Sequence, residues 1–183
     1  MMMEVVVFAI LSVGVVALSW RSLKSRRSHG FYRFFAFESI LVLLLLNVDR
    51  WFSDPFSGSH IASWVLLSLS LALACDGFYL LEKVGRPSGQ RDGSTNFGFE
   101  NTTHLVARRS YRFIRHPLYC SLLLLAWGVF LKDVTLWTAV AVLTASASLY
   151  ATAKVEEREN VLRFGDEYVR YMGRTKMFIP YFF

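Results

Sequence analysis

The stretch Tyr111–Leu125, YRFIRHPLYCSLLLL, sets a basic cluster directly against an apolar run, and this junction decides the class of fold. Arg112, Arg115 and His116 precede Pro117, after which the chain is almost entirely apolar. One interpretation is a transmembrane helix whose positively charged flank anchors it at the membrane surface. The other is a functional site at the boundary between water and lipid.

The apolar residues of the 183-residue chain, 54% of which are hydrophobic, gather in long blocks. Backbone groups in lipid must be bonded within their own segment, and the blocks lack the alternation of barrel strands. We therefore predict an all-α integral membrane protein of about five transmembrane helices with a cytosolic C-terminal helical cap. The fourth block is short for a span of roughly 20 residues and is expected to form a hairpin with the fifth. The predicted spans are 3–20, 32–52, 61–82, 117–131 and 134–155.

The first block lacks a basic flank before it and a small-residue cleavage site after it, so we expect a span and not a removed signal peptide. The whole chain, 1–183, is predicted to be one membrane-embedded domain. It would comprise three N-terminal spans (1–82), a cytosolic loop (83–115), and a helical hairpin with a C-terminal tail (116–183).

Lysine and arginine residues are distributed very unevenly between the two sides of these spans. With the N-terminus outside, eighteen of the twenty basic residues fall in predicted cytosolic segments, and only Arg50 and Lys132 lie outside. This topology explains the net charge of +6 without a nucleic-acid partner. The membrane would be the inner (plasma) membrane of a prokaryote or the endoplasmic reticulum membrane of a eukaryote. The sequon at Asn101 would be cytosolic and not glycosylated.

The two cysteines, Cys75 and Cys120, lie within apolar blocks and have no partners at metal-like spacing. We predict small buried hydrophobic side chains at both positions and no metal site. Residues 85–101 are rich in Gly, Ser and Asn, which fits either a flexible connector or a lid over a site.

The C-terminal tail holds polar residues close to the end of the fifth span. Glu156 and Glu157 form either a solvated helix end or a buried pair with partners. Tyr168 and Tyr171 are three residues apart and share a helix face. They belong either to an interfacial aromatic belt or to a site.

Two segments together resemble a known family. YRFIRHPLY resembles the RHP-x-Y signature of integral-membrane methyltransferases, which include the isoprenylcysteine carboxyl methyltransferases and the phospholipid N-methyltransferases. EERENVLRFGDEYVRYMGRTKMFIP resembles their C-terminal pattern of a Glu pair, Phe-Gly, two spaced tyrosines, a basic residue and Ile-Pro. The resemblance covers about residues 105–180. The chain departs from the family at Arg109-Ser110, Thr152, Lys154 and Asn160, which bears on the acceptor more than on the cofactor.

The resemblance implies S-adenosylmethionine as cofactor, with catalysis mainly by alignment and desolvation. A basic group would hold the cofactor's carboxylate, and a Glu would accept hydrogen bonds from its ribose or ammonium. Pro117 is suited to the first position of a helix. The residues implied in cofactor binding are Arg115, His116, Pro117, Tyr119, Glu156 and Glu157.

The acceptor implied is a lipophilic small molecule or lipid-modified substrate dissolved among the membrane lipids. A carboxylate acceptor, which we favour, needs an orienting cation such as Arg174. An amine would need a base such as Glu157, and a thiol would need an activating group that the sequence does not indicate. Tyr168, Tyr171 and Arg174 are the predicted acceptor-binding residues, although Arg174 also suits a plain membrane-surface position. A non-enzymatic membrane scaffold or interaction protein is the alternative of another class.

Overall fold

The computed structural model describes residues 2–87 and 97–182, and within those ranges it is helical, with no strand longer than an isolated bridge. The prediction of an all-α integral membrane protein is confirmed. The short 3-10 helices are η1 (Val48–Arg50), η2 (Gly98–Glu100) and η3 (Arg109–Arg112). The α-helices are α1 (Met2–Leu23), α2 (His29–Leu46), α3 (Gly58–Lys83), α4 (Pro117–Phe130), α5 (Leu136–Phe164) and α6 (Asp166–Arg174).

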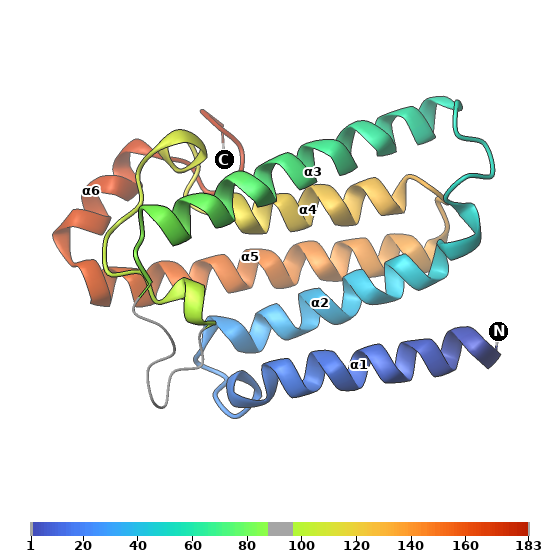
Figure 1. Cartoon of the computed structure of the whole chain (residues 1–183), viewed down its shortest axis with the longest axis horizontal. Coiled ribbons are helices and arrows are strands. Elements are labelled where there is room, and N and C mark those ends of the chain that lie inside the picture. Colours follow the sequence, from blue (N-terminus) through green and yellow to red (C-terminus); the bar gives the residue numbers. More distant parts are fainter. Residues whose placement is uncertain (1, 88–96, 183) are drawn as a thin grey trace.

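Helices α1 to α5 run side by side in one elongated bundle (Figure 1). Helix α5 packs against α2 and α4, while α3 packs against α4 and α1 against α2. Small buried side chains on α5, Ala141, Ala145 and Ala153, let neighbouring backbones approach closely. Leu43 of α2 and Val129 of α4 fill the space between the helices and are fully buried.

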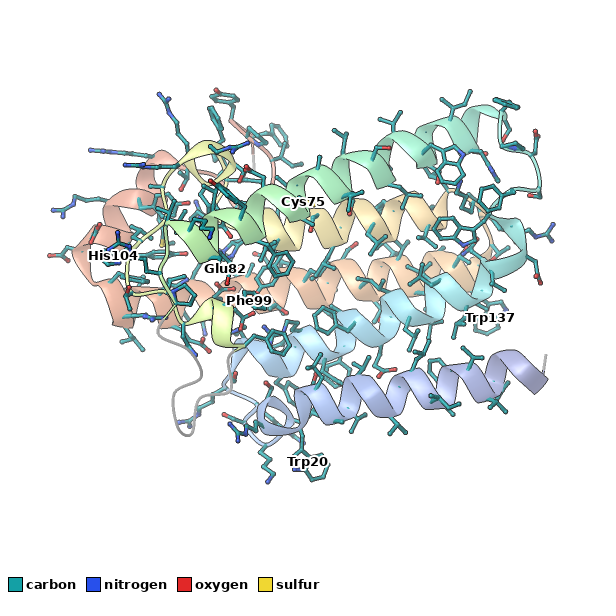
Figure 2. All side chains as sticks on the ribbon, viewed as in Figure 1. Trp20, Cys75, Glu82, Phe99, His104 and Trp137 are labelled. Atoms are coloured by element: carbon teal, nitrogen blue, oxygen red, sulfur yellow. The ribbon has the colours of Figure 1, made fainter. Side chains whose placement is uncertain are left out.

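The outward faces of the bundle have the character of a lipid-facing surface. Four helices, α1, α2, α3 and α5, are long and apolar enough to cross a membrane, whereas α4 has only 14 residues, as its sequence predicted. Trp20 and Trp137 are exposed near opposite ends of the bundle (Figure 2), where aromatic belts meet the two membrane surfaces.

Two sequence predictions need correction. The second span ends at Leu46 and not at 52, because the Asn47 side chain donates to the Leu43 carbonyl (2.9 Å) and a 3-10 turn follows. The fifth helix continues beyond its predicted span to Phe164, which agrees with a helix that runs past the membrane. Cys75 is exposed, since α3 packs on α4 along one face and turns Cys75 outward (Figure 2), while Cys120 is half-buried. Of the loop 85–101, for which the sequence fits a connector or a lid, residues 88–96 lie outside the described residues.

One glycine and a short backbone pairing build the end of the bundle that carries α6. Gly165 joins α5 to α6 with φ 58° and ψ −137°, a conformation that side-chain-bearing residues rarely adopt. Helix α6 then crosses the end of the bundle (Figure 1). Beyond α6, Lys176 donates to the Phe113 carbonyl (3.0 Å), and Arg115 N–H donates to the Lys176 carbonyl (2.8 Å). The tail is thereby fixed to the RHP junction.

Candidate active site

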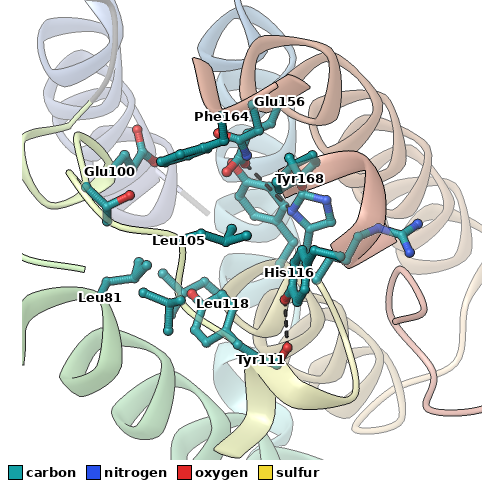
Figure 3. A pocket seen from close by; sticks show the side chains of 15 residues that line it. Leu81, Glu100, Leu105, Tyr111, His116, Leu118, Glu156, Phe164 and Tyr168 are labelled. Carbon is teal, nitrogen blue, oxygen red and sulfur yellow. Dashed lines mark hydrogen bonds and ion pairs between the residues drawn. The ribbon is translucent and has the colours of Figure 1, made fainter. Parts of the chain in front are cut away.

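A half-open cavity lies at the α6 end of the bundle, between α3, α4, α5, α6 and the segment that precedes α4 (Figure 3). The cavity has a volume of about 80 Å³, and the empty space reaches about 630 Å³ when the open solvent at its mouth is counted. Leucine side chains face it on one side and titratable groups on another. Its lining consists of Leu81, Glu100, Thr102, Leu105, Val106, Tyr111, Arg115, His116, Leu118, Tyr119, Glu156, Asn160, Phe164, Tyr168 and Tyr171.

Arg115 and Glu157 form a buried ion pair beside this cavity. Arg115 Nε donates to Glu157 Oε1 at 2.6 Å, and the two side chains are 11% and 5% exposed. Arg115 Nη1 also donates to the carbonyls of Met172 and Thr175. A solvated helix end is therefore wrong for Glu157. Glu157 itself does not line the cavity, and the pair ties α5 to the end of α6.

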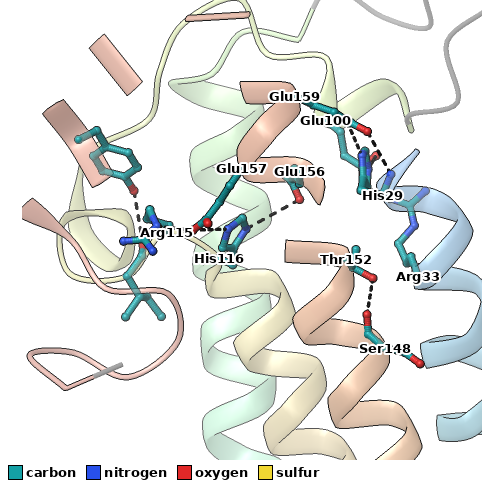
Figure 4. Close-up of polar contacts among 12 residues, drawn as sticks. His29, Arg33, Glu100, Arg115, His116, Ser148, Thr152, Glu156, Glu157 and Glu159 are labelled. Carbon is teal, nitrogen blue, oxygen red and sulfur yellow. Dashed lines mark hydrogen bonds and ion pairs between the residues drawn. The ribbon is translucent and has the colours of Figure 1, made fainter. Parts of the chain in front are cut away.

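His116 stands between two carboxylates. Its Nε2 lies 3.6 Å from Glu157 Oε1 and its Nδ1 lies 3.8 Å from Glu156 Oε2 (Figure 4). The imidazole stacks on Tyr119 with ring centroids 5.4 Å apart. Within the described part of the chain Nε2 is buried without a hydrogen-bond partner. The nearest carboxylate to this nitrogen is Glu157, outside the cavity lining, whereas the imidazole ring itself forms part of the cavity wall. Pro117 opens α4 immediately after His116, as predicted.

The two tyrosines of α6 are buried, so the aromatic-belt interpretation is wrong for them. Tyr168 is 3% and Tyr171 is 8% exposed. Burial raises the pKa of both phenols well above the usual value, which keeps them neutral hydrogen-bond donors. Tyr171 donates to the Tyr111 carbonyl at 2.6 Å, whereas Tyr168 lines the cavity together with Asn160. Glu156, 24% exposed, lines the same cavity.

Arg174 does not join the cavity. It is exposed and lines a separate groove, called here the basic groove, which meets the cavity at Leu105 and Tyr171. The lining of the basic groove is Leu105, Ala107, Arg112, Glu167, Arg170, Tyr171, Arg174 and Thr175. The structure thus brings Arg115, His116, Pro117, Tyr119, Glu156, Glu157, Tyr168 and Tyr171 together and leaves Arg174 outside.

A second charged cluster adjoins the cavity and was missed from the sequence (Figure 4). His29 contacts Glu159 at 2.6 Å and Glu100 at 3.4 Å, and Arg33 forms an ion pair with Glu100. Phe97 N–H donates to Glu100 Oε2 at 2.9 Å. Burial raises the pKa of Glu100, but the hydrogen bond from His29 and the charge of Arg33 outweigh it and hold that pKa below its usual range.

A signal for this cluster was present in the sequence. His29 and Arg33 are four residues apart, on one face at the start of an apolar span. Unpaired ionisable groups at such a position destabilise the protein, so the spacing predicts that oppositely charged side chains lie next to them.

Comparison with known proteins gives one partial similarity. The chain is 31% identical to Methanethiol S-methyltransferase 1 of Bradyrhizobium diazoefficiens over an alignment of 99 residues. The alignment covers 46% of this chain and 33% of that protein, so the chain spans about a third of its relative's length. No family model and no solved structure matches. The similarity supports methyl transfer at a membrane.

Proposed function

We propose that this protein transfers a methyl group from S-adenosylmethionine to a lipophilic acceptor dissolved in the membrane. The observation that carries the proposal is one cavity in which buried polar groups face an apolar wall. His116, Glu156 and Tyr168 supply the polar side, and Leu81 and Leu118 belong to the apolar side.

The position of the cavity along α5 favours a water-soluble cofactor together with an acceptor dissolved in the membrane. At 1.5 Å per residue, Glu156 lies about 30 Å along α5 from Leu136, which is roughly the thickness of a bilayer's hydrocarbon core. The cavity therefore lies near the inner edge of the lipid tails, if α5 begins at the opposite edge. A water-soluble cofactor has access from one side, and an apolar acceptor from the other.

The residues present fit the cofactor's functional groups. Glu156 is proposed to accept hydrogen bonds from the ammonium or the ribose hydroxyls of the cofactor, and the His116 imidazole to contact a second polar group of the cofactor. Tyr119, stacked on His116, would close the wall beside them. Because Arg115 and Glu157 are bonded to each other and Arg115 also donates to two backbone carbonyls, we assign them a positioning role: they hold His116 and the tail in place.

When bound, S-adenosylmethionine supplies an electrophilic methyl group. The protein's contribution is to align the acceptor and to exclude water, for which the leucine wall is suited. A neutral amine or thiol acceptor must lose a proton, and His116, placed between two carboxylates, is the candidate base. This geometry and the name of the similar protein favour a thiol as one candidate acceptor. A carboxylate acceptor would have to reach Arg174 in the basic groove, since that cation lies beyond the cavity.

Cofactor binding separates the enzyme from a non-enzymatic scaffold. We expect the detergent-purified chain to bind S-adenosylhomocysteine in a calorimetric titration, and His116→Ala to abolish binding. His60→Ala is the matched control, because His60 is equally buried but contacts the Lys132 carbonyl, in the turn between α4 and α5. No binding by the wild type would remove the proposal. Transfer of labelled methyl into thiol, carboxylate and amine acceptors would then identify the acceptor class.

A further inference from the structure

We propose that the basic groove binds the phosphate of an acidic phospholipid in the membrane leaflet beside α6. Arg112, Arg170 and Arg174 line it and are exposed. In the ranges that the structure describes, no ion pair joins any of these guanidinium groups to a carboxylate. Of the groove's described lining, Glu167 alone is acidic, so the charge of the groove is positive.

The arrangement of the three arginines suits a shared anion. Arg170 and Arg174 are four residues apart on one face of α6, and Arg112 comes from η3 across the groove. Like charges in this arrangement repel one another, and an anion among them relieves that repulsion. Guanidinium groups bind phosphate oxygens through paired hydrogen bonds, which makes a phosphate the best-matched ligand.

The level of the groove identifies the source of the phosphate. Counted from Glu156, which is near the inner edge of the hydrocarbon core, α5 extends about 12 Å further to Phe164 and so ends close to the headgroup layer. Helix α6 follows after the single residue Gly165 and crosses the end of the bundle, which brings it to headgroup level (Figure 1).

Exposed aromatic side chains beside the groove mark the same level. Phe113 directly follows Arg112 and is 42% exposed, and its ring lies 6.2 Å from that of Tyr181, which is 84% exposed. Ile179 and Phe182 are also exposed on this part of the tail. Aromatic residues next to arginines are typical of the interface between lipid tails and water.

Native mass spectrometry of the full chain in a neutral detergent tests the proposal. Phosphatidylglycerol is titrated in, with phosphatidylcholine as the zwitterionic comparison. The groove variant is R112Q/R170Q/R174Q. The matched control is R21Q/R26Q/R27Q, which removes three exposed arginines from the predicted first cytosolic loop. We expect wild type and control to bind phosphatidylglycerol equally, and the groove variant to bind it about 100-fold more weakly.

Several outcomes would overturn the proposal, and those measured as lipid binding do not depend on methyl transfer. Equal losses in both variants would mean diffuse surface attraction only. Retained affinity in the groove variant would remove the site. Displacement of phosphatidylglycerol by inorganic phosphate at constant ionic strength would identify a soluble anion as the ligand. An unchanged lipid affinity with a raised KM for a carboxylate acceptor would assign the groove to that acceptor instead.

Discussion

Replacing Arg33 with methionine should destabilise the wall of the cavity, although Arg33 is not one of the residues that line it. The Arg33 side chain is 3% exposed, forms an ion pair with Glu100, and lies 3.8 Å from the Phe97 ring centroid. Removing one partner of a buried ion pair costs roughly 3–5 kcal/mol, because the other charge is left uncompensated. Glu100 would keep His29 at 3.4 Å and the Phe97 N–H at 2.9 Å, so we expect about 3 kcal/mol, at the lower end of that range.

The loss should be local, and hydrogen exchange can detect it. Glu100, Thr102, Leu105 and Val106 all belong to the cavity wall. We expect amides 98–106 of Arg33→Met to exchange roughly 100-fold faster, while the α4 and α5 amides keep their protection. Cofactor affinity should fall in parallel. Arg33→Lys should restore part of the protection, because it returns the charge without the planar fork.

Two results would contradict a local role for Arg33 in the cavity wall. One is wild-type exchange across 98–106 in Arg33→Met. The other is a uniform loss of protection throughout the bundle, which would show that Arg33 stabilises the whole fold and not the wall. Because exchange is measured without ligand, either result is independent of whether the protein is a methyltransferase.

Three further predictions concern single contacts at the same end of the bundle. Tyr171→Phe removes a buried hydrogen bond of 2.6 Å to a backbone carbonyl and should lower the free energy of unfolding by about 1–2 kcal/mol in a detergent unfolding assay. Gly165→Ala should cost about 1–3 kcal/mol through its positive φ, although nothing lies within 4 Å of the added methyl, whereas Gly173→Ala, helical and equally open, should not destabilise. The pKa of Glu100 is lower in the folded state than its ordinary value of 4.5. Its contribution to the free energy of unfolding is therefore complete above pH 4.5 and is lost as the pH falls through the lowered pKa. Glu100→Gln should therefore reduce the loss of unfolding free energy at acid pH. An unchanged loss would contradict the ion pairing assigned to Glu100.

The sequence predicted the spans because bilayer thickness fixes the length of an apolar helix, but helix ends depend on single side chains. Asn47 ends α2 by bonding back to its own last turn, a contact that hydropathy does not register. The location of Arg174 was unpredictable for a similar reason. The direction in which α6 leaves α5 is set by the backbone angles of Gly165, and this direction turns Arg174 into the basic groove and not into the cavity.

The charged cluster of α2 escaped prediction because its partners are remote in the chain. His29 meets Glu100 and Glu159 across 71 and 130 residues. Its own spacing with Arg33 indicated a need for partners but gave no means of identifying them. Most residues that line the cavity, by contrast, belong to the two segments that resemble the methyltransferase family, and that resemblance already implied that they form one site.

One turn of α5 explains why the clusters meet at the cavity. Glu156 and Asn160 are four residues apart, share a helix face and both line the cavity. Glu157 is rotated about 100° from Glu156 and meets Arg115, and Glu159 points to a third direction and meets His29 (Figure 4). A single helical turn therefore fixes the RHP junction on one side and α2 on the other while it presents two polar groups to the cavity. This turn has to lie beyond the hydrocarbon core, because its carboxylates need cationic partners and access to water. The length of α5, 29 residues, follows from that requirement.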